Sequence, residues 1–394
     1  MMLNRFSKTL AGAGLVLAMA ACTSKKDGNI DNPPTTVAED KAAITATSKE
    51  LVQGVKNLSD GQMVRSLFKT IGLENGQIKN EVWMDDLTDA LDMAFLGFEL
   101  DPETSRFDFS RYSGEYTWNA QTKKFVKTAA SDITVKFPAD PASATNDYVF
   151  KISEYKDGKY KVNMKDVYLP TAIKANLKKG ADELLTLTFN AEFSTGNFPI
   201  PSNIQLLLKL KPVDFAVKVT KLSDTQFDVA TRLLAVGDNA TALNAKVTFK
   251  DNDYNNLDIE EDLIAVEGAL KQGNLTLKGA LDAKSYFLLP DGASADKFNT
   301  VFNLSAFSKD QEIGQLKLKD NNNGQEMVIF YKDKTSEKAS VYTEAFIKDL
   351  KAVLQPDFGT DVENWFERTA QSKGSFAKKI VNIKNKVSGW IGKK

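Results

Sequence analysis

The sequence predicts an α+β protein that is predominantly antiparallel β: a long meander of about a dozen strands with helices at both ends. Two observations carry this prediction. Within residues 101–332, apolar side chains recur at every second position, which is the period of a half-buried strand. On both sides of that segment the spacing lengthens to three or four residues, as in an amphipathic helix. A curled sheet, a half-barrel and a sandwich all fit this pattern.

The segment 40–100 is expected to hold helices that pack on the sheet. Its clearest part is Asp85–Phe98, where one helical face is apolar and the opposite face is acidic. The apolar stripe consists of Leu87, Leu91, Ala94, Phe95 and Phe98.

Short turn sequences separate the expected strands of the β body. Asp157-Gly158, Lys179-Gly180, Gln272-Gly273 and Asn323-Gly324 are each predicted to close a hairpin. Connections this short join antiparallel strands, so the body is expected to be a meander.

The segment 333–394 is expected to return to helix, and its last part is unusual. From Thr369 to Lys394 there are seven lysines and no acidic residue. An apolar stripe recurs there at intervals of four and three residues, formed by Phe376, Ile380, Ile383, Val387 and Trp390. A basic amphipathic helix either docks on its own body or lies on an anionic membrane, and docking is favoured.

The first 21 residues have the character of a signal peptide. Arg5 and Lys8 are followed by Leu10–Ala21, whose 12 apolar or small residues are too few for a membrane-spanning helix. Cys22 comes next and is the only cysteine of the chain. Exported proteins normally use cysteines in pairs as disulfides, so a single cysteine indicates another role.

The aliphatic, small, small, cysteine pattern of Met19–Cys22 resembles the lipobox of bacterial lipoprotein precursors. The resemblance implies cleavage before Cys22, a diacylglycerol on its sulfur, and acylation of the new amino terminus with a chain such as palmitate. The β-rich body is similar in pattern to Bacteroidota envelope lipoproteins of unassigned function. Thr23, where an Asp would imply inner-membrane retention, favours the outer membrane and leaves the periplasmic face and the cell surface both open.

Residues 22–39 are expected to form a tether, because Pro33-Pro34 excludes helix there. Cleavage before Cys22 would leave 49 basic and 52 acidic residues, a net charge of −3, and no nucleic-acid partner is expected. The expected partner is membrane lipid through the anchor, with an envelope protein or a glycan as the ligand classes left open.

The chain has no histidine, which removes histidine nucleophile pairs, general bases and metal ligands. Calcium remains, since Asp251, Asp253 and Asn255 fit the first, third and fifth ligand positions of an EF-hand loop. Asn256 replaces the turn glycine, however, and Asp262 replaces the bidentate glutamate. A polar strand connection is therefore favoured over a metal site, and no cofactor is expected beyond the covalent lipid on Cys22.

Two groups of residues bear on a glycan substrate. Asp85, Asp86, Asp89 and Asp92 supply the carboxylates that a glycosidase needs, but one polar helix face is solvated by default. Tyr116, Trp118 and Phe125 lie on an expected hairpin and either stack on sugars or belong to the core. Their alternation favours the core.

Two classes of function remain. The favoured one is a non-catalytic binding or structural protein held at the outer membrane, with a carrier of an apolar ligand in a curled sheet as a variant. The other is a carboxylate-dependent, glycosidase-like hydrolase. No residue stands out as catalytic, so an enzyme is the less favoured class.

Overall fold

The computed structural model describes residues 36–59, 106–139, 142–162, 164–196, 198–236, 239–254, 257–290, 292–321 and 324–353. These residues fall into two compact units, 36–56 with 218–353 (unit 1) and 57–59 with 106–217 (unit 2). Cys22, most of the expected tether, the acidic stretch Asp85–Asp92 and the basic terminal segment lie outside the described residues.

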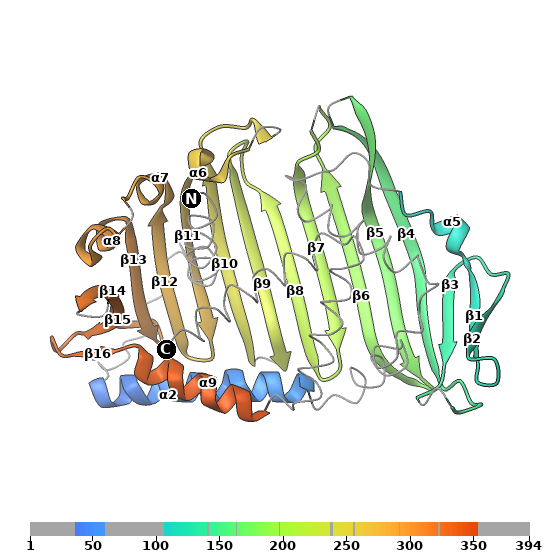
Figure 1. The fold of residues 1–394 in the computed structure, drawn as a ribbon, viewed down its shortest axis with the longest axis horizontal. Helices are drawn as coiled ribbons and strands as arrows, with labels where there is room; N and C mark the ends of the chain where they lie inside the picture. Colours follow the sequence, from blue (N-terminus) through green and yellow to red (C-terminus); the bar gives the residue numbers. More distant parts are fainter. Residues whose placement is uncertain are drawn as a thin grey trace. The chain divides into compact units, whose positions relative to one another are not determined.

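The described strands form one mixed, mostly antiparallel sheet in the order β16-β15-β14-β13-β12-β11-β10-β9-β8-β7-β6-β5-β4-β3-β1-β2 (Figure 1). From β4 onward each strand lies beside the strand that precedes it in the chain, so the predicted long meander is confirmed. β1 is the exception, because it runs antiparallel to β2 and parallel to β3. β2 and β16 therefore stand at the two ends of the strand order.

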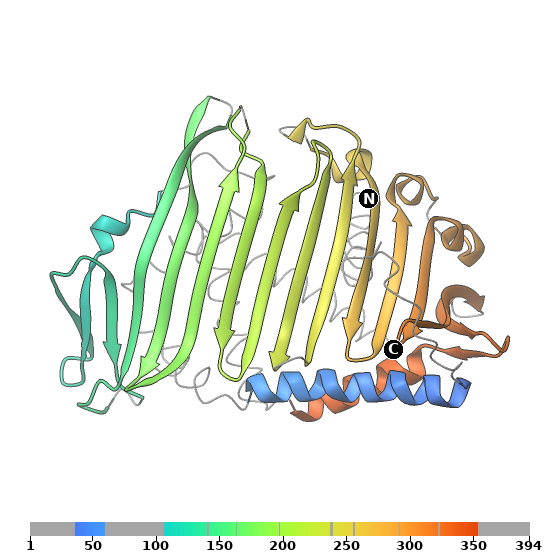
Figure 2. The same cartoon turned by 180° about the vertical axis from the view of Figure 1, so that it is seen from behind.

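Unit 1 contains the later strands and five of the described helices. The strands are β9 (Gln226–Val236), β10 (Asn239–Phe249), β11 (Leu263–Gln272), β12 (Leu275–Asp282), β13 (Phe302–Ser308), β14 (Gln311–Asn321), β15 (Gly324–Tyr331) and β16 (Ser336–Lys338). The helices are α2 (Val37–Ser59), α6 (Ile259–Asp262), α7 (Ala283–Phe287), α8 (Ala295–Val301) and α9 (Ser340–Val353). Both views show α2 and α9 side by side along one end of these strands, with α6 and α7 at the other end (Figures 1 and 2).

Unit 2 contains the earlier strands. They are β1 (Gly114–Asn119), β2 (Lys124–Thr128), β3 (Ile133–Phe137), β4 (Tyr148–Val162), β5 (Lys165–Lys179), β6 (Asp182–Phe193) and β7 (Pro201–Leu210), with the short helix α5 (Phe109–Tyr112) before them. β8 (Val213–Lys221) carries the boundary between the units. The core of unit 2 lies on one face of its strands, where Ile133, Ile152, Leu177 and Phe189 are fully buried.

Helix α2 begins at Val37, inside the segment 22–39 that was expected to be tether. Thr36 and Glu39 form a capping box: the Thr36 backbone N–H donates to Glu39 Oε2 at 2.7 Å, and the Glu39 N–H donates to Thr36 Oγ1 at 3.3 Å. The hydrogen bonds from Thr36 also lower the pKa of Glu39. The cap explains why the helix starts before residue 40.

Two of the predicted hairpin turns are confirmed. Lys179 pairs with Asp182, and Gln272 pairs with Leu275, so each turn consists of two residues that begin with a glycine. Gly180 and Gly273 have φ of +58° and +54°, a region that glycine enters without steric cost. Asn321 pairs with Gly324, so a third turn lies within one residue of the predicted Asn323-Gly324.

The predicted turn at Asp157-Gly158 is wrong. Asp157 and Gly158 pair with Pro170 and Leu169 inside β4 and β5, beside a register shift between Lys156 and Asp157. The Asp157 carboxylate is held by both Nε and NH2 of Arg106, at 2.6 and 2.9 Å. The chain turns instead next to Met164, whose φ is +68°.

We predict that Gly314→Ala destabilises unit 1 by about 3 kcal/mol or more in chemical denaturation. A Cβ atom on Gly314 would lie 2.2 Å from the carbonyl oxygen of Phe330, which is backbone and cannot move without breaking the β14–β15 pairing. Gly180→Ala is the control, because a Cβ there meets nothing within 4 Å and only the positive φ is strained, at about 1 kcal/mol. Equal effects of the two substitutions would contradict the close contact at Gly314.

Candidate functional site

The strands of unit 1 carry apolar side chains on one face, which we call the apolar face of unit 1. Leu243 lies opposite Leu270, Leu270 opposite Leu277, and Leu277 opposite Ala306. By the same registers, this face also carries Val229, Val247, Val266, Leu281, Phe302, Leu304, Leu316 and Ile329. The alternate positions, such as Asn244, Lys246, Glu267 and Lys271, belong to the opposite face. The segregation expected from the period of two therefore holds over most of these strands, with Thr231, Thr241 and Gln272 as polar residues on the apolar face.

Small residues form the middle of the apolar face of unit 1. Ala245 pairs with Gly268, and Gly268 pairs with Gly279, so three adjacent strands present no side chain larger than a methyl group there. The hydroxyl of Thr231, which lies opposite Leu243 on β9, is buried and makes no hydrogen bond. A buried hydroxyl without a partner is uncommon, because leaving it unpaired costs free energy.

Helix α2 borders the apolar face at one end of the strands. Val37 and Ile44 pack on a cluster that includes Ile313 and Ile329. Glu50, further along the helix, accepts a hydrogen bond from Gln272 Nε2 at 3.5 Å, and Gln272 in turn accepts one from the Thr241 hydroxyl. α2 is thus held by apolar contacts near its start and, further along, by the hydrogen bonds that link Glu50 to Gln272 and Gln272 to Thr241.

Aromatic side chains border the opposite end of the same face. Tyr286 and Phe287 of α7 and Phe298 of α8 pack on Val266, Leu281, Phe302 and Leu304. Beside them, Phe227, Phe249 and Tyr254 meet edge to face, with ring centroids 5.5–6.1 Å apart. The Tyr254 hydroxyl donates a hydrogen bond to the carbonyl oxygen of Asp224 at 2.7 Å, so the polar atom of this aromatic group also has a partner.

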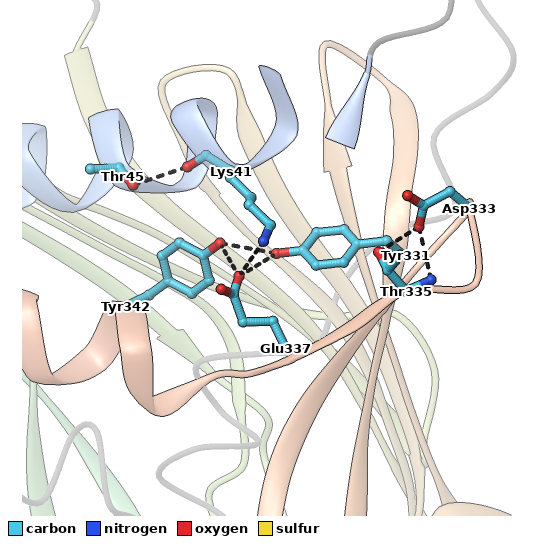
Figure 3. A network of polar contacts seen from close by, with 7 residues as sticks. All are labelled: Lys41, Thr45, Tyr331, Asp333, Thr335, Glu337 and Tyr342. Atoms are coloured by element: carbon cyan, nitrogen blue, oxygen red, sulfur yellow. Dashed lines mark hydrogen bonds and ion pairs between the residues drawn. The ribbon is translucent and has the colours of Figure 1, made fainter. Parts of the chain in front are cut away.

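A polar cluster of unit 1 joins α2 to β15, β16 and α9 (Figure 3). Glu337 Oε2 accepts hydrogen bonds from the hydroxyls of Tyr342, at 2.7 Å, and Tyr331, at 3.3 Å. Lys41 Nζ lies 3.1 Å from the same oxygen and 5.5 Å from the centroid of the Tyr331 ring. The two tyrosine hydroxyls are 3.0 Å apart. The four residues come from four elements, so the cluster ties them together.

The electrostatics of this cluster favour a structural role. The hydrogen bond from Tyr342 is the main reason that the pKa of Glu337 is lowered, and Lys41 adds to it. Burial is the main reason that the pKa values of Tyr331 and Tyr342 are raised. At neutral pH the glutamate is therefore ionised, and both tyrosines keep the protons that they donate. These protonation states suit a cluster that holds the four elements together, and they do not suit a nucleophile or a general base.

The weak calcium candidate lies in a connection whose acids serve the local backbone. Asp251 Oδ1 accepts the Asp253 N–H at 3.0 Å, and its other oxygen lies 3.8 Å from Lys250 Nζ. Asp258 caps α6, and Asp262 Oδ2 accepts the Asp258 N–H at 2.8 Å. Asn255 is outside the described residues. In the described part of the chain, no three acidic side chains are grouped as a metal site would require.

The aromatic hairpin belongs to the core, as its alternation predicted. Tyr116 is buried, and Trp118 and Phe125 meet edge to face at 5.2 Å. Trp118 and Phe125 also pack against the cluster of Phe137, Tyr148 and Leu177. Packing on the core is therefore the role that the structure shows for these rings.

The carboxyl groups whose pKa is shifted by their surroundings do not suit the role of a glycosidase acid. Such an acid needs a raised pKa, so that it holds its proton near neutral pH. Among the residues that the structure describes, every carboxyl group with a resolved shift has a lowered pKa. They are Glu39, Asp108, Asp132, Glu154, Asp166, Asp224, Asp282, Glu326, Asp333 and Glu337. The Asp85–Asp92 acids lie outside the described residues.

Unit 2 has an open depression of about 230 Å³ beside the connection of β7 to β8, next to the start of β6. Its lining mixes the charged Glu183, Lys209, Lys211 and Asp214 with Leu184, Leu185, Thr186 and Pro212. Of the helices in the described residues, none is long and apolar enough to cross a membrane. Comparison of the chain with protein-family models, curated proteins and solved structures finds no match.

We predict that Glu337→Gln lowers the free energy of unfolding by about 1–3 kcal/mol at neutral pH, because it removes the charged acceptor of two hydroxyls. The pKa of Glu337 is lower in the folded chain than its ordinary 4.5, so its contribution is present above that pH and is lost as the pH falls below it. The difference from the wild type should therefore shrink on acidification.

Chemical denaturation at a series of pH values measures this difference. Glu312→Gln, an acid of β14 outside the cluster, is the control. A difference in unfolding free energy between wild type and Glu337→Gln that stays constant from neutral to acid pH would contradict the stabilising role of this cluster.

Proposed function

We propose that the chain is a lipid-anchored protein of the bacterial outer membrane that acts by binding, not by catalysis. Two independent features support the two halves of this proposal. The lipobox pattern that ends at Cys22 supports the anchor. The apolar face of unit 1, bordered by α2 at one end and by aromatic side chains at the other, supports a binding role.

The anchor rests on physical grounds as well as on the resemblance. A diacylglycerol and an amide-linked acyl chain bury many methylene groups, each worth about 0.8 kcal/mol, so they hold a protein stably at a bilayer. The segment between Cys22 and Thr36 then separates the first described helix from the membrane by a short stretch rich in polar residues and proline. The anchored residue is Cys22 itself.

Binding is favoured over hydrolysis by the state of the carboxyl groups and tyrosines. The resolved carboxyl pKa values in the described ranges are lowered by lysines, hydroxyls and backbone donors, which keeps these groups ionised at neutral pH. Ionised carboxylates suit ion pairs and caps. The strongest single support for binding remains the apolar face of unit 1, which extends over several neighbouring strands and has only small side chains at its middle.

The apolar face favours one ligand class in particular, an amphiphile with an alkyl chain. Ala245, Gly268 and Gly279 place no side chain larger than a methyl group in the middle of three strands, while leucines and valines surround them. The hydroxyl of Thr231, which is buried and has no hydrogen-bond partner, offers a polar contact on this face. These features support the carrier as the specific form of the binding function.

For the anchor, we predict that mass spectrometry of the amino-terminal peptide from native membranes shows a diacylglyceryl-modified and acylated Cys22. Cys22→Ser should leave an unprocessed precursor or release the chain from the membrane fraction. An unmodified terminus, or one that starts after Cys22, would rule the anchor out.

For the carrier, we predict that Leu270→Gln weakens the binding of a dansyl-labelled fatty acid about tenfold, because it places an amide among apolar contacts. Lys271→Gln is the matched control, since the neighbouring residue points to the opposite face and is exposed. Leu270→Met preserves size and apolar character and should restore binding. Fluorescence titration below the unfolding temperature reads out all three variants, and equal affinities of Leu270→Gln and wild type would exclude this face as the ligand site.

A further inference from the structure

A hairpin of unit 2 extends beyond the strands on either side of it. β4 pairs with β3 only as far as Ile152, and β5 begins to pair with β6 only at Ala172. Between these limits β4 and β5 still pair with each other, from Asp157 opposite Pro170 to Val162 opposite Lys165. We call Asp157–Val162 with Lys165–Pro170 the β4–β5 arm.

One face of the arm is buried and fixes its position. Val162, Val167 and Leu169 are 3%, 5% and 0% exposed. Tyr160, on the same face by register, meets the Phe193 ring edge to face at 5.4 Å. A free two-stranded hairpin is marginally stable in water, so this packing is what makes the arm a defined surface.

The other face of the arm is charged and has more cations than acids. Lys159 and Lys161 share Asp166, at 2.6 and 2.5 Å. Arg106 pairs with Asp157 and stacks on the Tyr168 ring, with its Cζ 4.5 Å from the centroid. Lys165 lies opposite Val162, at the end of the buried face, and its side chain is exposed. The whole arm together with Arg106 therefore carries four cations and two acids, a net of +2 on a chain whose formal net charge is −1.

At the base of the arm, two more lysines share one carboxylate. Lys156 and Lys174 share Glu154, at 2.6 and 2.7 Å, which adds one more net positive charge. All of these lysine side chains are more than half exposed. Where two lysines share one carboxylate, an incoming anion can take over the second lysine without leaving an acid unpaired.

The tip of the arm carries an exposed methionine. Met164 is 91% exposed and has a φ of +68°, and it stands between the buried Val162 and the exposed Lys165. A flexible apolar side chain with lysines beside it matches the boundary between lipid headgroups and acyl chains, where lysine stems lie along apolar matter and the ammonium groups stay at the phosphates.

We propose that the β4–β5 arm binds the anionic headgroup surface of a membrane, with Lys159, Lys161 and Lys165 on headgroup phosphates and Met164 entering the layer below them. The presence of a nearby bilayer rests on the proposed lipid anchor. The contact itself belongs to the folded arm, so it is measured on a soluble form without the anchor and stands or falls apart from Cys22.

The experiment uses the chain from residue 22 onward with Cys22→Ser and follows its co-sedimentation with vesicles. Binding is expected to vesicles with about 30% phosphatidylglycerol, to be weak with phosphatidylcholine alone, and to fall with salt. Lys161→Glu with Lys165→Glu should weaken binding at least about tenfold, from two surface lysines each worth about fivefold. Met164→Ser should weaken vesicle binding without changing net charge.

Two further double variants control for charge. Lys209→Glu with Lys211→Glu makes the same change of charge elsewhere on unit 2 and should bind vesicles like the wild type. Lys379→Glu with Lys384→Glu makes it in the basic terminal segment. If the terminal variant loses vesicle binding and the arm variant does not, the proposal is overturned.

Inorganic polyphosphate serves as a soluble anion of the same chemistry. The proposal expects Met164→Ser to leave polyphosphate binding unchanged while it weakens vesicle binding. Equal effects of Met164→Ser on both, or vesicle binding that is insensitive to Met164, would show that the arm recognises soluble polyanions and would overturn the membrane assignment.

Discussion

The segregation of side chains by the period-two alternation is the constraint on which the rest of this protein depends. When one strand has apolar residues at alternate positions, each neighbouring strand has to place its own apolar residues on the same face of the sheet. Otherwise polar groups are buried without partners. Leu243, Leu270 and Leu277 keep this register across β10, β11 and β12. The polar residues between them are free to form ion pairs such as Lys246 with Glu267. The apolar side chains and these ion pairs thus lie on opposite sides of the same strands.

The sequence was sufficient for the architecture because the decisive signals are local. The alternation of Ile133, Val135 and Phe137 and the glycine turns at Gly180 and Gly273 need no long-range information. The turn at Asp157-Gly158 failed because a residue far away in sequence, Arg106, binds the aspartate and holds it within a strand. β9 and β13 carry the same alternation, but the sequence analysis did not separate them from their neighbours, and α7 and α8 are too short to show a helical period.

The candidate site was less accessible from the sequence. The core position of Trp118 and Phe125 follows from alternation, and the local use of Asp251 and Asp258 follows from their spacing to backbone donors. The cluster of Lys41, Tyr331, Glu337 and Tyr342 has no sequence signature, because its members are a helix lysine, a strand tyrosine, a strand acid and a helix tyrosine that only tertiary packing brings together. A tyrosine whose pKa is raised by burial cannot be recognised before its surroundings are known.

The meander also determines the order in which the chain can finish folding. Each strand from β4 onward finds its partner in the segment just synthesised, so most of the sheet forms by local steps with low contact order. α2 is the exception: Glu50 and Gln272 are separated by 222 positions, and Lys41 reaches Glu337 only after nearly every strand has appeared. α2 is therefore the first described helix to be synthesised, but its contacts with Gln272 and Glu337 form only after most of the sheet has been made. Until that moment the apolar side chains of this helix, Val37 and Ile44 among them, have no core to pack against, so its amino-terminal apolar stripe stays exposed to water longer than the side chains of the strands.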